Sequence, residues 1–262
     1  MEVTMAKNVA EKQDGEIAVY DTDLLSAGTG LEDATSADYA IPFLRVIQAM
    51  SPQLKKSDGK YIEGAQQGML YNTVTNELFD GEEGVLVIPC SYSKQWIEWV
   101  PRTQGGGFVS ADHDASILEK CTRNDKKEYI MESGNEIKET AQYFSLIVND
   151  ESEPEQVLLS FTSSQLGFSR RWNSMLRTAR VKNAEGNSVL APMFSYIYRL
   201  KTVEQSNDLG SWYGVTAERE KPTPIELARL SLDFMKAAKG GAVVVRQEGA
   251  ADDVASDEEV PF

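Results

Sequence analysis

The sequence predicts a mainly β protein with a few helices, and three observations support this fold class. Stretches rich in β-branched and aromatic residues alternate with turn-forming residues. Helical spacing of apolar residues is confined to three segments, and no internal repeat is visible. With 262 residues, 41% of them hydrophobic, the chain can bury a full core, as one domain with extensions or as two small domains.

The N-terminal part of the chain is expected to change character at residue 38. Residues 1–37 are polar and acidic without a sustained period, which predicts a disordered or extended segment. Asp38–Met50 carries a proline suited to a first helical turn and a short apolar face, so we expect a short helix there. Ser51–Gly68 is predicted to be a loop, and Leu70–Phe79 a hairpin.

The next segment predicts a long strand followed by a long excursion. Val85–Val100 is rich in β-branched and aromatic residues, which is typical of one long strand or a strand with a bulge. Pro101 and the glycines at 105–107 end it. Residues 102–138 are polar and charged, so we expect a long loop with a short strand at Glu128–Glu132.

Two further strands lead into the central helix. Alternating apolar residues predict strands at Ala141–Val148 and Gln156–Thr162. Thr162 and Gln165 have the spacing of a capping box, so a helix is expected from about Thr162 to about Val181.

The last part of the chain predicts two strands and an appended helix. A turn at Asn183–Asn187 precedes strands at Pro192–Thr202 and Trp212–Arg219. Thr223 as N-cap, with proline and glutamate behind it, begins a helix that ends at the glycine pair Gly240-Gly241. Strand, long loop, strand, strand, helix, strand, strand is the element order of an OB-fold, a five-stranded barrel with a helix between its third and fourth strands. We therefore assign residues 38–241 to an OB-fold-like domain and residues 242–262 to a flexible acidic tail.

Charge is distributed unevenly along the chain. The net charge is −15, but residues 1–40 carry nine acidic and two basic side chains, and residues 248–262 carry six acidic and no basic ones. Residues 162–201 hold seven basic side chains and one acidic one. Because the acidic charge lies at the two ends, the total does not exclude binding of nucleic acid by the middle of the chain.

Aromatic and basic residues are interleaved on the first long strand. Binding a single strand without regard to sequence needs cations for the phosphates and aromatic faces for the bases. The alternating residues of the strand and the residues at its glycine-hinged end are candidates for these contacts: Tyr92, Lys94, Trp96, Trp99, Arg102 and Phe108. The loop that follows could close over the bound strand.

The fourth and fifth strands offer a second set of candidate DNA contacts. Phe194 and Leu200 are expected in the core. Alternate positions along the fourth strand do not divide into one apolar face and one polar face. The binding candidates therefore remain Tyr196, Tyr198, Arg199, Lys201 and Trp212. Burial tendencies alone predict that most of the aromatic residues are structural.

The central helix carries arginines opposite its apolar face. Arg170, Arg177 and Arg180 form a possible basic patch, for which an ordinary solvated helix face is an equal alternative. The patch could also hold the acidic C-terminal tail when DNA is absent. Deleting residues 257–262 should then tighten DNA binding.

The last six residues form an acidic run closed by a Pro-Phe carboxylate: Asp257, Glu258, Glu259, Val260, Pro261 and Phe262. A terminal Phe ring can enter an apolar pocket while its carboxylate is held by basic groups. This ending resembles the tails of bacterial single-stranded DNA-binding proteins, which end in an acidic stretch followed by Ile-Pro-Phe. The chain as a whole is more similar to the divergent single-stranded DNA-binding proteins of bacteriophages, which have an OB-fold and an acidic, Phe-terminated tail. The resemblance implies coating of single-stranded DNA in replication, recombination and repair, with the tail recruiting partner proteins.

Other classes of function have less support in the sequence. His113, Cys90 and Cys121 lack the spacing of a zinc site, and a single histidine without a nucleophile elbow or phosphate loop argues against triad or ATP-driven catalysis. We expect no enzyme activity, cofactor or metal. The N-terminus lacks the features of a signal peptide and no apolar run is long enough for a membrane span, so a cytoplasmic protein that does not bind membranes is expected.

Three alternatives stay open: a phage strand-annealing or recombination-mediator protein, a regulatory or virion protein that does not bind DNA, and a metal-dependent nuclease. The sequence leaves the oligomeric state undecided, a homo-oligomer included.

Overall fold

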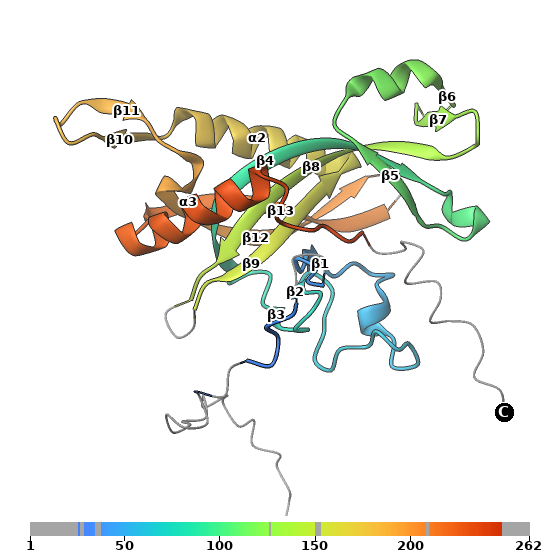
Figure 1. The fold of residues 1–262 in the computed structure, drawn as a ribbon. Coiled ribbons are helices and arrows are strands. Elements are labelled where there is room, and N and C mark those ends of the chain that lie inside the picture. Colours follow the sequence, from blue (N-terminus) through green and yellow to red (C-terminus); the bar gives the residue numbers. More distant parts are fainter. Residues whose placement is uncertain are drawn as a thin grey trace, which may run out of the picture.

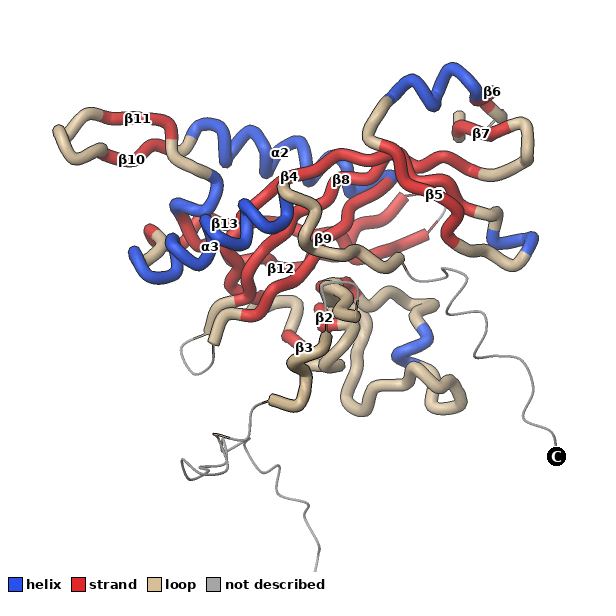
Figure 2. Tube along the Cα trace, viewed as in Figure 1, coloured by secondary structure: helices blue, strands red, loops and turns tan. Residues whose placement is uncertain are grey.

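The computed structural model describes residue 26, residues 29–34 and residues 38–247 apart from 126, 150–152 and 208–209, with the backbone alone for Arg102. In this part of the chain, long antiparallel strands form a curled sheet that makes half of a barrel, with one α-helix on each face (Figures 1 and 2). The predicted mainly β class is confirmed.

The strands are β1 (Leu44–Val46), β2 (Leu70–Asn72), β3 (Leu78–Phe79), β4 (Val85–Trp99), β5 (Phe108–Asp112), β6 (Cys121–Arg123), β7 (Tyr129–Met131), β8 (Glu136–Ile147), β9 (Glu155–Thr162), β10 (Arg180–Lys182), β11 (Ser188–Leu190), β12 (Tyr196–Asn207) and β13 (Gly210–Pro222). The α-helices are α2 (Leu166–Thr178) and α3 (Ile225–Lys239), and short 3₁₀ helices lie at Pro52–Leu54, Arg102–Gln104, Ala115–Lys120, Ser163–Gln165 and Met193–Ser195.

Five long strands make the half-barrel, in the order β13-β12-β4-β8-β9 with every neighbouring pair antiparallel. The first three residues of β4 pair with β12, whereas its last four pair with β5. The beginning of β8 likewise pairs with β7. The long strands therefore leave the barrel at one end and continue as a smaller extension built from β5, β6 and β7 (Figure 1).

A bulge in β4 lies between Pro89 and Ser91, where its register with β8 shifts. The sequence analysis allowed for a bulge in this strand. A bulge increases the local twist of a strand, and a sheet that curls toward a barrel needs such twist. Val87 before the bulge faces the inner core together with α2, whereas Ile88 and Cys90 face the outer core under α3. Each face of the sheet is thus covered by one helix.

The inner core is aromatic. The Trp172 ring of α2 stacks on Tyr143 of β8 with their centroids 4.5 Å apart, and it meets Tyr198 of β12 edge-on at 5.9 Å. All three side chains are buried. The Tyr143 hydroxyl is hydrogen-bonded to the Ser169 hydroxyl at 2.8 Å and donates to Asn173 Oδ1 at 2.9 Å, so burial of this polar group is compensated by α2.

The segment before residue 50 is extended, so the predicted helix over Asp38–Met50 is wrong. Leu158 of β9 donates its backbone N–H to Pro42 O at 2.8 Å, and Phe43 forms a parallel bridge with Leu158. Ile41 and Phe43 enter the outer core, whereas Leu44 enters the inner core. A segment that fills both cores as it passes the edge of a sheet is buried on two sides, and tertiary burial outweighs the weak helical periodicity.

The same segment also reaches the opposite edge of the half-barrel. Gln48 Nε2 donates to Tyr213 O of β13 at 2.8 Å, and Tyr213 N donates to Gln48 Oε1 at 2.8 Å. The amide side chain of Gln48 therefore pairs with the backbone of β13 as a neighbouring strand would. Residues 41–48 lie in the opening between β9 and β13.

Residues 102–138 hold more structure than the predicted long loop. They contain β5, β6, β7 and the 3₁₀ helix at Ala115–Lys120, and a third apolar cluster forms there around Trp96, Ile117 and Ile137. The expected strand at Glu128–Glu132 corresponds to β7. The strands β5 and β6, of five and three residues, carry too little apolar periodicity to be detected in the sequence.

The remaining elements follow the sequence in outline, but the bounds of both helices differ and the β10–β11 strands were not predicted. Leu70–Phe79 forms the expected hairpin of β2 and β3, and Asn183 closes the β10–β11 turn by accepting hydrogen bonds from Glu185 N and Asn187 N. The central helix is shorter than expected. The 3₁₀ helix at Ser163–Gln165 precedes α2, Thr162 makes no capping hydrogen bond, and α2 ends at Thr178 instead of near Val181 because Arg180–Lys182 forms β10.

Helix α3 begins one residue later than expected, because its N-cap is Pro224 and not Thr223, without a capping hydrogen bond from a side chain. It ends before Gly241, which has φ +74° as expected for a left-handed stop.

Candidate nucleic-acid interface

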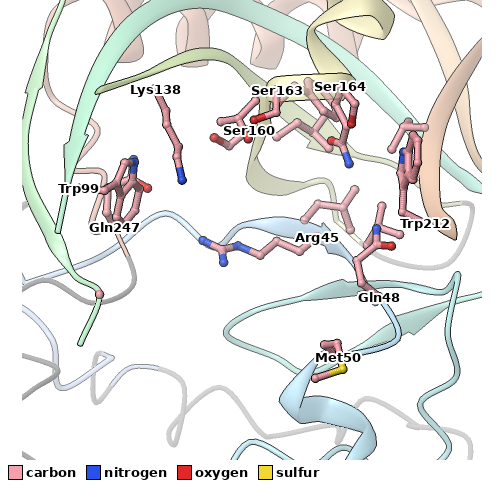
Figure 3. Close-up of a pocket in the computed structure, with 18 of the residues that line it drawn as sticks. Arg45, Gln48, Met50, Trp99, Lys138, Ser160, Ser163, Ser164, Trp212 and Gln247 are labelled. Atoms are coloured by element: carbon pink, nitrogen blue, oxygen red, sulfur yellow. The ribbon is translucent and has the colours of Figure 1, made fainter. Parts of the chain in front are cut away.

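A groove with a volume of about 1020 Å³ opens where β1 lies between β9 and β13. Its walls come from the end of β4, the start of β8, the junction between β9 and α2, the start of β13 and the segment at 44–50 (Figure 3). The glycines at 105–107, on the connection that leaves β4, line it as well. The groove is therefore bordered by the connection that follows β4 and by the start of β13.

Two tryptophans from different strands line the groove on opposite sides, Trp99 at the end of β4 and Trp212 at the start of β13 (Figure 3). Both side chains are half-buried. The Trp99 ring packs edge-on against Phe108 of β5 with the centroids 5.9 Å apart. Trp212 Nε1 donates to Gln205 Oε1 of β12 at 3.1 Å. Each indole is therefore fixed by a neighbouring strand while part of its surface stays accessible.

The side chains of Arg45 and Lys138 extend into the space between the two tryptophans (Figure 3). Arg45 is carried by β1, with its guanidinium carbon 4.7 Å from the centroid of the Phe43 ring, and Lys138 is carried by β8. Lys60 is a third cation of the lining, and Glu136 is the one acidic side chain among the described residues that form it. Lys138 Nζ lies 2.8 Å from Glu136 Oε2. The groove has a net positive lining inside a strongly acidic chain.

Neutral hydrogen-bonding groups line the groove where β9 passes into α2. Ser160, Thr162, Ser163, Ser164 and Gln165 all contribute to the wall. Ser163 has φ +50°, which turns the chain sharply between strand and helix. A smaller hollow of about 200 Å³ shares Ser164 and Gln165 with the groove and adds Arg171 and Gln205. The polar surface thus continues past Trp212 toward α2.

The pKa shifts of Cys90 and of the core tyrosines are opposite to those of an activated nucleophile, whose pKa is lowered. Burial raises the pKa of Cys90 to about 12, and burial also raises the pKa of Tyr143 and of Tyr198 above the ordinary value of tyrosine. Both cysteines are free thiols. Across the described residues, no three His, Cys, Asp or Glu side chains are grouped to hold a metal ion. No helix in the described part of the chain is long and apolar enough to span a membrane.

Of the DNA-binding residues predicted on the first strand, some lie at the groove and others lie outside it. Trp99 lines the groove and Phe108 supports its ring. Tyr92 is exposed on β4 beside Tyr143, outside the groove lining, and Lys94 pairs with Glu139 of β8 at 2.9 Å. The side chain of Arg102 lies outside the described residues.

Trp96 is a core residue and is therefore not available to stack on a base, contrary to the expectation from the strand pattern. Its side chain is 6% exposed and packs in the third apolar cluster, with its ring 6.3 Å from that of Tyr129. Lys94 lies over the same ring at 4.8 Å. The extension at 102–138 covers a tryptophan that the strand pattern alone would leave exposed.

The candidates on the fourth strand lie mostly away from the groove. Tyr198 is completely buried, and a ring in the inner core cannot stack on a base, so this residue is also withdrawn. Tyr196 is half-buried and donates its hydroxyl to Arg180 O at 2.7 Å. Arg199 and Lys201 form ion pairs with Glu220 and Glu218 of β13, at 2.6 and 3.7 Å. As expected, Leu200 is buried, whereas Phe194 is half-buried against the outer core.

The predicted basic patch is exposed but lies outside the groove lining. Arg170 and Arg177 are on α2 and Arg180 begins β10. Residues 257–262 of the tail and most of residues 1–37 lie outside the described residues. The described chain does reach the groove at Gln247, which lines it and is buried.

Sequence reasoning missed most of the cations and several polar groups of the groove: Arg45, Lys60, Lys138, Gln165 and Gln247. These residues come from five separate segments, and no local cluster of cations singles them out. The one usable signal was the sharp junction after Gln156–Thr162, where three hydroxyl residues in a row precede the helix.

The fold and the site define a β-rich half-barrel protein with a cationic, tryptophan-flanked groove. A family model described as Pam3 phage gp34-like protein matches residues 11–244, and the chain belongs to this family. The expected phage association is confirmed to that extent. No curated protein and no solved structure matches the chain.

Proposed function

We propose that the protein binds single-stranded DNA, without regard to sequence, in the groove between Trp99 and Trp212. The observation that carries this proposal is the pair of accessible indoles on opposite sides of a groove whose interior holds Arg45 and Lys138. Indole faces stack on any base, and each stack contributes about 1–3 kcal/mol, while the cations neutralise phosphates. Half-burial fixes the rings, so little conformational entropy is lost when a strand enters.

An OB-type barrel is part of the proposal. The pairings β4–β8, β8–β9, β4–β12 and β12–β13, with α2 between β9 and β12, are those expected for such a barrel. OB-folds bind oligonucleotides between the loops after the first and fourth strands. The position of the groove supports this comparison, because it is lined by the glycines after β4 and by the start of β13.

The acidic tail would recruit replication, recombination or repair proteins. Phe262 and its carboxylate offer an end group for an apolar pocket with basic surroundings, and the acidic residues would speed encounter with a basic partner. Residues 248–262 follow directly on Gln247, which lines the groove. In a phage-infected cell these roles place the protein in the host cytoplasm. It would act by binding, without catalysis.

The test is titration of the full-length protein with oligo-dT, followed by tryptophan fluorescence. Strong quenching at low salt is expected, and the logarithm of affinity should fall with the logarithm of salt with a slope near −3 if Arg45, Lys60, Lys138 and Arg171 neutralise about four phosphates. Trp99→Ala and Trp212→Ala should each weaken binding about 5- to 150-fold.

Tyr92→Ala is the matched control, because it removes an exposed aromatic residue of β4 outside the groove. It should leave affinity near that of the unaltered protein. Absence of quenching and of binding at low salt would overturn the proposed function. If Tyr92→Ala weakened binding and the two tryptophan variants did not, DNA would bind around Tyr92, outside the groove.

A further inference from the structure

The β10–β11 hairpin projects from the body of the protein beyond one end of α2 (Figure 1). Within the described chain, its two strands pair with each other and with no other strand. An isolated two-stranded hairpin is only marginally stable in water. A projecting hairpin of this kind gains stability when another surface covers it.

One face of the hairpin combines cations with an exposed apolar side chain. Arg180 is paired with Leu190 in the register, and Lys182 with Ser188, so these side chains share a face. Leu190 is 60% exposed. Arg180 and Lys182 make no ion pair with any described residue. An apolar centre with a charged rim is the composition of a protein interface.

The other end of the sheet presents the opposite charge. Residues 109–119, which run from β5 through the following 3₁₀ helix, contain Asp112, Asp114 and Glu119 and no lysine or arginine. All three carboxylates are exposed, and Val109 beside them is 44% exposed. Figure 1 shows β5 and the β10–β11 hairpin at opposite ends of the molecule.

We propose that the basic hairpin of one copy, residues 180–190, docks on the acidic segment 109–119 of a second copy. The two surfaces are complementary in charge, and each has an exposed aliphatic side chain to pack against the other. Because the surfaces differ and lie at opposite ends, the contact is head-to-tail, and repetition gives a row or a ring of copies. This self-association does not require DNA binding.

A protein surface fits the hairpin better than nucleic acid does. Its exposed large hydrophobic side chains are Leu190 and Val189, whereas a strand of nucleic acid would use an aromatic face between the cations. The hairpin cations would still attract phosphates, so the experiment must separate the two occupants.

The experiment measures the mass of the full-length protein by sedimentation over a range of concentrations, without DNA, at low and high salt. Self-association that weakens with salt is expected. R180E/K182E and D112K/E119K should each weaken self-association about tenfold or more. Leu190→Ser should weaken it without changing charge. Mixing the two charge variants should restore assembly, because the unaltered hairpin of one variant meets the unaltered acidic segment of the other, and the two altered surfaces are again opposite in charge.

K55E/K56E is the matched control, since it makes the same change of charge on exposed lysines of another loop. It should associate like the unaltered protein, and circular dichroism verifies that each variant is folded. A protein that stays monomeric at low salt overturns the proposal, as does unchanged association of R180E/K182E. If R180E/K182E lost affinity for oligo-dT while its self-association persisted, the hairpin would be a DNA contact and the proposal would be wrong.

Discussion

Gln205 controls the orientation of Trp212 through a single hydrogen bond. Its Oε1 accepts from the indole Nε1 at 3.1 Å, and its side chain lies over Gly214, where a Cβ would come within 2.6 Å of the Gln205 amide nitrogen. Gln205→Met keeps the size of the side chain but removes the acceptor. Because a hydrogen bond of this kind contributes about 0.5–1.5 kcal/mol, affinity for oligo-dT should fall about 2- to 10-fold.

The emission spectrum of tryptophan provides a second measurement for Gln205→Met. A freed indole samples more water, so emission should shift to longer wavelength along with the loss of affinity. Gln66→Met changes an exposed glutamine outside the groove and should alter neither. Unchanged emission and unchanged affinity in Gln205→Met would show that the hydrogen bond does not position the ring.

Gly81 is required by its contacts with the backbone. Its carbonyl oxygen accepts from Thr202 N at 2.8 Å, and a Cβ at this position would overlap Gly68 O and the Thr202 hydroxyl. Gly81→Ala should therefore lower the free energy of unfolding by about 1–3 kcal/mol, as overpacking does. Urea denaturation measures the loss. Gly59→Ala is the control, because no atom lies within 4 Å of its added Cβ, and a comparable loss there would refute the steric explanation.

At the scale of elements, the strap at residues 41–48 joins the two open edges of the half-barrel. The two hydrogen bonds of Gln48 to the backbone of Tyr213 are its connection to β13. Gln48→Ala removes both hydrogen bonds and leaves the backbone N–H and C=O of Tyr213, on the edge strand β13, without these partners. The free energy of unfolding should fall by about 1–3 kcal/mol in a urea titration. Gln67→Ala, at an exposed glutamine, should cost far less, and equal losses would contradict the role of the strap.

The long elements could be predicted from sequence because each carries its own periodicity. The strands at 85–99 and 155–162 and both helices were found from local patterns of apolar residues. The strap was missed because its burial depends on β9 and β13, which are distant in the sequence. Trp96 was misplaced for a related reason, since the cluster around Ile117 covers it and that segment has no strong period of its own.

The candidate site was only partly predictable. Trp99 and Trp212 could be selected as aromatic residues at strand ends beside glycine turns. Arg45, Lys138 and Gln165 could not, since each is unremarkable within its own segment and the fold alone brings the three into one groove. A site assembled from segments that are distant in the sequence leaves no local signature in a single sequence.

At the scale of the whole molecule, both cores contain a group that must stay protonated. Cys90 lies in the outer core, and Tyr143 and Tyr198 lie in the inner core. Burial raises the pKa of Cys90 from 9.0 to about 12 and raises the pKa of both tyrosines above 10.0. The unfolded chain loses these protons at lower pH than the folded chain does. Stability is therefore fully present below about pH 9 and falls as pH rises toward the folded pKa values.

Urea denaturation between pH 7 and pH 11 tests this expectation. The free energy of unfolding should be nearly constant up to about pH 9 and then decrease, with Cys90 alone contributing up to about 1.4 kcal/mol per pH unit. Cys90→Ala should lower stability at pH 7 through the cavity it creates, yet flatten the decrease between pH 9 and pH 10. Cys121 is only half-buried, so Cys121→Ala should keep most of the slope. A decrease of equal slope in Cys90→Ala and in the unaltered protein would show that the buried thiol does not couple alkaline pH to unfolding.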